Sequence, residues 1–281
     1  MLDRRLVLVS GKGGVGKSAV AAGIALLAQR HGLRVLAIEM GSPGGFSAHF
    51  GVGPLYFDPR EVRPGLHAMR IVRSEALLEY LSLQLRLPGM GRFGPFARAF
   101  DALATAAPAI REIITLGKVL WEVKAERWDL VVADAPPTGQ LGSFLRAPVS
   151  IAELVPTGRV RAQADWMRRI LADPERTQLV LVTLPEELPV LEVAETTAWL
   201  ERQGLVPPPR VVANRVLPDL EDTSTPEGPV GEMATLHRSL LVEQDRWLAH
   251  LDVDLRLPFL FGLFTPGEVA VHISDLLEAV A

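Results

Sequence analysis

A glycine-rich turn near the start of the chain constrains the fold more than any other feature. Residues 6–9 are a run of four apolar side chains, which leads through SGKGGVGKS into an alanine-rich segment. This order is typical of a β-strand that passes into an α-helix around a bound phosphate, because free backbone N–H groups at a helix N-terminus attract anions. The turn therefore predicts a nucleotide-binding α/β fold.

Short aliphatic runs recur along the chain and alternate with longer segments in which apolar residues are spaced three and four apart. Runs without polar alternation are typical of strands buried on both faces of a parallel sheet. We therefore predict an α/β fold with a doubly wound, mostly parallel sheet covered by helices on both faces. The expected strands are residues 6–9, 35–38, 69–72, 130–133, 179–182, 211–213 and 255–257.

One segment interrupts this alternation, because residues 74–127 have helical spacing almost throughout and contain a central glycine- and proline-rich break. We expect a helical subdomain here, inserted into the nucleotide-binding core that is formed by residues 1–73 and 128–281. A second segment, residues 217–233, is acidic and rich in turn-forming residues, which favours an exposed loop.

Composition excludes several classes of protein. The formal net charge of -4 gives no general electrostatic reason to expect a nucleic-acid partner. The longest apolar run, residues 19–28, is much shorter than the roughly 20 residues needed to span a bilayer, so no stable membrane insertion is expected. The four apolar residues at 6–9 are also too few for a secretion signal, which predicts a cytoplasmic location.

The glycine turn fits two nucleotide-binding patterns. It matches G-x-G-x-x-G, with Glu39 at the end of the second expected strand, as in dinucleotide-dependent oxidoreductases. It also matches G-x-x-x-x-G-K-[ST], in which Lys17 would neutralise the outer phosphates and Ser18 would bind Mg²⁺. The two extra polar groups favour a P-loop NTPase that binds ATP or ADP with Mg²⁺. The surrounding phosphate contacts are expected from Gly11, Gly13, Gly14, Val15, Gly16 and Ala19.

A second set of polar residues follows the expected strand at residues 130–133. Asp134 comes directly after this strand and precedes the turn PPTG. A carboxylate at this edge of the sheet can hold the water shell of a magnesium ion that is bound to phosphate. Asp134 is therefore the second candidate magnesium residue, together with Ser18.

The motifs resemble those of a known family of ATPases. GKGGVGKS is similar to the deviant Walker A motif of the dimeric ArsA and MinD class. DAPPTG resembles the switch II motif of ArsA and of the guided-entry ATPases that target tail-anchored membrane proteins. Further similarities are LVTLPEELPVLEVAET, VVANR and RLPFL. The resemblance implies that Lys12 reaches the nucleotide of a facing subunit, that Asn214 contacts adenine, and that Pro258 packs nearby.

Two departures from this family limit what the resemblance implies. The chain has no cysteine, which excludes the thiolate arsenite site of ArsA pumps and the zinc clamp of guided-entry ATPases. In addition, Gly41 occupies the position where the family has a water-positioning aspartate. Either Glu39 takes over this role through a rearranged loop at residues 41–45, or the chain is a catalytically weak regulatory subunit. Single-half bacterial relatives are often encoded as non-identical pairs, so both a homodimer and a heterodimer are expected options.

The resemblance also implies an output for the ATPase cycle. In guided-entry ATPases, opening and closing of the dimer with the nucleotide state assembles an apolar groove for a hydrophobic protein client. The expected helical insert carries enough apolar residues for such a groove, although the same spacing suits an ordinary helical core. These residues are Leu81, Leu83, Leu85, Leu87, Met90, Phe93, Phe96 and Phe100.

Overall fold

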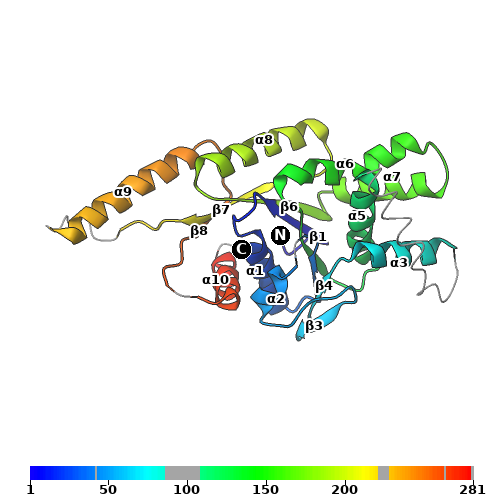
Figure 1. Ribbon diagram of the computed structural model, residues 1–281, viewed down its shortest axis with the longest axis horizontal. Coiled ribbons are helices and arrows are strands. Elements are labelled where there is room, and N and C mark those ends of the chain that lie inside the picture. The colour runs from blue at the N-terminus through cyan, green and yellow to red at the C-terminus, as the bar shows by residue number, and fades with distance from the viewer. Residues whose placement is uncertain (42, 86–107, 221–227, 263, 280–281) are drawn as a thin grey trace.

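An eight-stranded sheet forms the centre of the computed structural model, which describes residues 1–41, 43–85, 108–220, 228–262 and 264–279 (Figure 1). The strand order is β3-β4-β2-β5-β1-β6-β7-β8, and β3 is the one strand paired antiparallel. The predicted fold class, a mostly parallel α/β sheet, is therefore confirmed. The strands are β1 Leu6–Gly11, β2 Val35–Glu39, β3 Arg60–Arg63, β4 Leu66–Arg70, β5 Leu130–Asp134, β6 Thr177–Thr183, β7 Arg210–Val216 and β8 Leu255–Pro258.

The edge of the sheet differs from the prediction in the bounds of one strand and in the presence of another. The strand predicted at residues 69–72 is β4, which begins at Leu66 and ends at Arg70, so residues 71 and 72 already lead into the next helix. Strand β3 was not predicted, because its sequence REVR is charged and lies at the exposed edge of the sheet. It pairs only with β4, and the register of that pair is irregular between Glu61 and Arg63.

Helices cover both faces of the sheet, as a doubly wound fold requires. On one face, α1, α2 and α10 form a core with the inward side chains of the central strands. On the other face, α5, α6, α7 and α8 form the second core. The helices are α1 Lys17–Arg30, α2 Gly45–Phe50, α3 Arg73–Leu85, α5 Pro108–Lys124, α6 Thr138–Leu154, α7 Arg159–Ala172, α8 Glu187–Gln203, α9 Pro229–Leu248 and α10 Pro266–Glu278.

The expected helical insert contributes α3 and α5 to the described part of the chain. Helix α5 packs on the sheet, because Leu116 and Leu120 are fully buried in the same core cluster as Leu6 and Ile38. A separate subdomain at residues 74–127 thus stays a prediction. Residues 86–107, which carry most of the expected client-binding side chains, lie outside the described residues.

Helix α9 corrects the prediction of an exposed loop at residues 217–233. The helix begins at Pro229, whose ring favours the first turn of a helix, so the last five residues of the expected loop are helical. Residues 221–227 lie outside the described residues. Only Gly231 and Leu248 of α9 are buried, and the helix extends well beyond the sheet (Figure 1).

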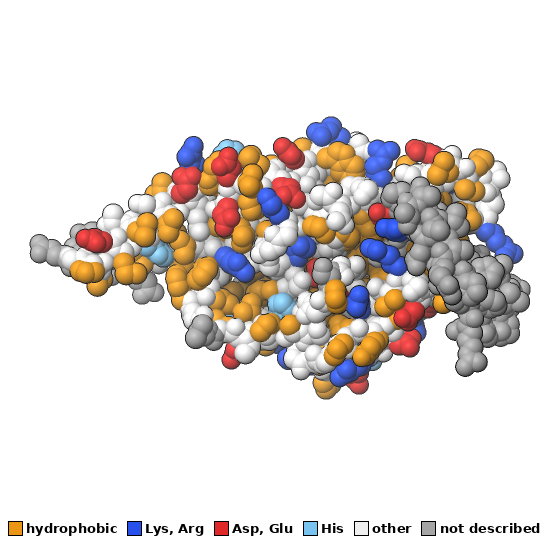
Figure 2. Space-filling model, viewed as in Figure 1, with side chains coloured by type: hydrophobic (Ala, Val, Ile, Leu, Met, Phe, Trp, Pro, Cys, Tyr) orange, Lys and Arg blue, Asp and Glu red, His pale blue; other side chains and the backbone are white. Residues whose placement is uncertain are grey.

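The extended part of α9 carries exposed apolar side chains, which gather along it in the space-filling view (Figure 2). Met233 is 71% exposed and Leu236 is 60% exposed, so this surface is unusually apolar for a solvated helix. Within the described residues, no helix is both long and apolar enough to cross a membrane.

Candidate active site

The glycine turn lies between β1 and α1 at the carboxyl edge of the parallel strands. Gly14 and Gly16 adopt the left-handed backbone conformation, with φ values of +86° and +91°. A Cβ atom at Gly16 would lie 2.4 Å from Nδ2 of Asn214, and one at Gly11 would lie 2.2 Å from the carbonyl oxygen of Val182. Glycine is therefore required at both ends of the turn, which brings its backbone close to neighbouring strands.

Three of the predicted phosphate and metal residues meet at this turn. Ser18, in the first turn of α1, donates a 2.5 Å hydrogen bond from Oγ to Oδ2 of Asp134. Asp134 is the last residue of β5, which lies between β1 and β2 in the sheet. Lys17 donates from Nζ to the carbonyl oxygen of Lys12 at 3.2 Å, so its ammonium group folds over the loop.

Asp134 has an electrostatic environment that suits a cation. The residue is 8% exposed, and burial raises the pKa of its carboxyl group above the ordinary value of 3.8. The hydrogen bond from Ser18 and the charge of Lys17 lower this pKa, whereas the charge of Glu39 raises it. The second carboxylate oxygen, Oδ1, is buried without a hydrogen-bond partner among the described residues.

An orphaned carboxylate oxygen beside a serine hydroxyl fits the chemistry of a hydrated magnesium ion, which prefers oxygen ligands and retains several waters. The described residues contain no cluster of three or more His, Asp or Glu side chains that could hold a metal by themselves.

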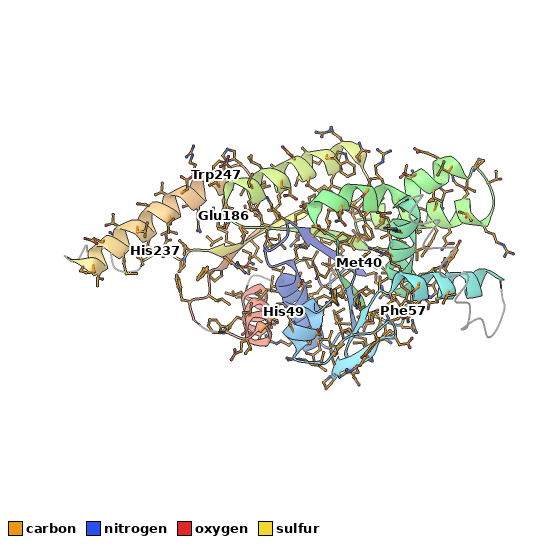
Figure 3. All side chains as sticks on the ribbon, viewed as in Figure 1. Met40, His49, Phe57, Glu186, His237 and Trp247 are labelled. Atoms are coloured by element: carbon orange, nitrogen blue, oxygen red, sulfur yellow. The ribbon has the colours of Figure 1, made fainter. Side chains whose placement is uncertain are left out.

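Glu39 is buried at the end of β2 and is 1% exposed. Its Oε1 accepts hydrogen bonds from the backbone N–H groups of Gly44 and Phe46, both at 3.1 Å. Glu39 therefore satisfies two of the free amides at the start of α2, a helix that also carries His49 (Figure 3). A role for Glu39 in positioning water stays a prediction.

The position of Gly41 is open. It is exposed, and a Cβ atom added there would have no heavy atom within 4 Å. Its backbone is not in the left-handed region. A larger side chain would therefore fit at residue 41, so packing does not explain the glycine.

Asn214 approaches the glycine turn from β7 rather than standing free at the end of its strand. Its Nδ2 donates to the carbonyl oxygen of Val15 at 2.9 Å, and its Oδ1 accepts from the N–H group of Arg215. Pro258 ends the neighbouring strand β8 and pairs with Val216. The contact of Asn214 with adenine, and the packing of Pro258 beside it, stay predictions.

Lys12 contacts a residue that had no predicted role. Its Nζ lies 3.7 Å from Oε2 of Glu192 on α8, and Oε1 of the same carboxylate accepts a hydrogen bond from the hydroxyl of Thr138. Sequence reasoning included Glu192 only within a longer similar segment. Lys12 and Glu192 are 180 positions apart, so no local pattern predicts their contact.

The family follows from comparison with known proteins. A model of the anion-transporting ATPase (ArsA) family matches residues 4–159, which include the glycine turn, Asp134 and Thr138. The chain belongs to this family. Membership confirms the expected P-loop ATPase with a nucleotide-binding turn and removes the dinucleotide oxidoreductase as an interpretation of the same glycines.

Relatives of this chain include several ATPases. ATPase BagA of Mycobacterium tuberculosis is 34% identical over 241 residues, which cover 82% of this chain and 70% of BagA. The arsenical pump-driving ATPase of Escherichia coli is 29% identical over 80% of this chain but only 36% of its own length. ATPase GET3C of Arabidopsis thaliana is 25% identical over 78% of this chain and 68% of its own length.

Proposed function

We propose that this protein is a magnesium-dependent ATPase that works as a dimer and converts the nucleotide state into a change of subunit arrangement. The observation that carries the proposal is the orphaned Oδ1 of Asp134 next to the hydroxyl of Ser18. When bound, magnesium would offset the charge of the outer phosphates. Ser18 would contact the metal, Asp134 would hold its water shell, and Lys17 would contact the outer phosphates.

Lys12 is the residue that makes a dimer part of this proposal. Its side chain is 36% exposed at the mouth of the glycine turn, so it can leave its own subunit. A cation supplied from a facing subunit stabilises the charge that develops on the transferred phosphoryl group, as an arginine finger does. Hydrolysis would then require closure of the dimer, whether the second subunit is a copy of this chain or a related one.

The output of the cycle would be conformational. Loss of the γ-phosphate would release the loop at residues 41–45 and the segment after Asp134, and the two subunits would separate. A hydrophobic protein client is the cargo that we propose, because residues 81–100 carry four leucines, three phenylalanines and a methionine.

A second candidate function is a nucleotide-binding regulatory subunit with little turnover of its own. The open space at Gly41 and the engagement of Glu39 with the amides of α2 favour it, since neither residue is placed to orient water. The variant Gly41→Asp separates the two functions, because an aspartate fits there without a clash. Restored turnover, on the order of tenfold or more, would favour the regulatory subunit.

Calorimetry and turnover together test the main proposal. We expect ATP to bind tightly only with magnesium, Lys17→Ala to abolish binding, and Lys12→Ala to retain binding while turnover disappears. Turnover should also rise more than linearly with protein concentration, because the active form is a dimer. Tight binding of ATP without any effect of magnesium, or full turnover in Lys12→Ala, would refute the proposal.

A further inference from the structure

One carboxylate connects the glycine turn to the helix that follows Asp134. Glu192 lies in the second turn of α8, and its two oxygens have different partners. Oε2 faces the ammonium group of Lys12 at 3.7 Å, and Oε1 accepts the hydrogen bond of Thr138, a buried residue that begins α6. A single side chain therefore joins three elements that are distant in sequence.

The two contacts differ in strength. The ion pair with Lys12 is loose, since both side chains are about one-third exposed and solvent screens their charges. The contact with Thr138 is a hydrogen bond to a charged acceptor, and Thr138 is only 6% exposed, so water competes less for this end of the carboxylate. Glu192 is thus anchored through Oε1 by Thr138, whereas its contact with Lys12 through Oε2 is easily broken.

We infer that Glu192 is a positioning residue that holds Lys12 within its own subunit until nucleotide and a second subunit are present. This inference rests on the proposed function, in which Lys12 must reach across to a facing nucleotide. Glu192 and the outer phosphates then compete for the same ammonium group. A triphosphate carries more negative charge than one carboxylate, so Lys12 moves to the phosphate once the subunits close.

The arrangement also links Lys12 to the segment that follows Asp134. Only four positions separate Asp134 from Thr138, and the carbonyl oxygen of Pro136 between them accepts a 2.6 Å hydrogen bond from Ser10 of β1. When Lys12 departs, Glu192 loses its only cationic partner within the described residues and keeps Thr138. The start of α6 is then held by a carboxylate whose charge is no longer compensated.

The pairing can be tested without nucleotide by measuring how fast acetic anhydride modifies Lys12. Ion pairing holds the amine of Lys12 against Glu192 and limits its encounter with the reagent, and the chain has only four lysines, so their peptides are readily distinguished by mass spectrometry. Glu192→Gln retains the shape and the acceptor for Thr138 but removes the charge. We expect Lys12 to react about two- to fivefold faster in this variant, with Lys124 as the internal reference.

Thr138→Val is the matched control, because it removes the hydroxyl and leaves the charge of Glu192 in place. It should raise the rate at Lys12 less than Glu192→Gln does, because the carboxylate loses one anchor but keeps the charge that attracts the lysine, whereas a merely structural role of Glu192 would make both variants behave alike. An unchanged rate in Glu192→Gln, or an equal increase in Thr138→Val, overturns the inference. Thermal unfolding of both variants checks that the fold is retained.

The competition with phosphate is measured by turnover. In Glu192→Gln, half-maximal turnover should occur at a protein concentration about two- to fivefold lower than in the wild type, because Lys12 is already free. An equal or higher concentration overturns the inference. Failure of the proposed function can be told apart from failure of this inference. If the proposed function fails, the wild-type protein does not bind ATP with magnesium, whereas the modification rates of Lys12 still test its pairing with Glu192.

Discussion

The hydrogen bond between Asn214 and Val15 predicts that loss of this asparagine damages phosphate binding and not only recognition of the base. Asn214→Ala leaves the carbonyl oxygen of Val15, a residue that is 1% exposed, without its donor. An unsatisfied buried carbonyl costs about 1–3 kcal/mol. At roughly 2–4 °C per kcal/mol for a chain of this size, the nucleotide-free protein should unfold about 2–12 °C lower.

Nucleotide binding should weaken as well, because the carbonyl of Val15 belongs to the turn that surrounds the phosphates. If about 1–2 kcal/mol of this cost falls on the ordering of the turn, affinity falls roughly 5- to 30-fold. Asn214→Asp provides a sharper variant, since it keeps the shape and the acceptor for Arg215 but replaces the amide donor with an oxygen.

Tripolyphosphate separates the two roles of Asn214, because it has phosphates and no base. We expect both variants to lose affinity for tripolyphosphate by this factor and affinity for ATP by at least as much, measured by calorimetry with magnesium present. If affinity for tripolyphosphate and the unfolding temperature stay at wild-type values while ATP affinity falls, the support of the turn by Asn214 is refuted. Adenine contact would then be its main role.

Three further predictions concern buried groups. Burial raises the pKa of Asp134, so its contribution to stability is present below pH 3.8 and is lost as the pH rises through the raised pKa. Asp134→Asn should therefore unfold at a higher temperature than the wild type at pH 7 without nucleotide, lose this advantage below pH 3.8, and lose turnover about 100-fold. Glu39→Ala should lower the free energy of unfolding, measured by chemical denaturation, by about 2–4 kcal/mol, because two backbone donors lose their acceptor. Glu39→Gln keeps an acceptor oxygen and should retain both stability and turnover. A stable but inactive Glu39→Gln would instead assign Glu39 to water positioning. Gly23→Ala should destabilise the protein by about 1–2 kcal/mol, because the new Cβ would lie 2.4 Å from Cγ2 of Ile273. Gly117→Ala should stabilise it by about 0.5–1 kcal/mol, because the nearest neighbour of its Cβ lies at 3.9 Å. Equal effects of the two variants in denaturant unfolding would contradict this packing argument.

The central part of the fold could be predicted from the sequence because buried parallel strands have an unmistakable pattern. The runs at residues 6–9 and 130–133 are apolar on both faces, and both became central strands. The edge could not be predicted in the same way, since REVR at β3 has the composition of a surface segment. Its pairing with β4 depends on tertiary context, which overrides the weak strand preference of charged residues.

In the candidate site, too, contacts within a motif or between adjacent strands could be predicted, whereas contacts that depend on the full strand order could not. The loop residues from Gly11 to Ser18 are contiguous, and the meeting of Ser18 with Asp134 follows from neighbouring strands of a parallel sheet. By contrast, the use of Asn214 as a support for Val15 requires the sheet order, which places β7 one strand beyond β6. No spacing in the sequence contains that information.

The two outer strands of the sheet have a consequence for assembly. Strand β3 offers a four-residue, charged border, and β8 is equally short and ends at a proline that has no N–H group to donate. Neither border is suited to hydrogen-bond a strand from another molecule. In the dimer that we propose, the subunits would therefore meet through surfaces other than the two edges of the sheet, which leaves the glycine turn and Lys12 available to face a partner.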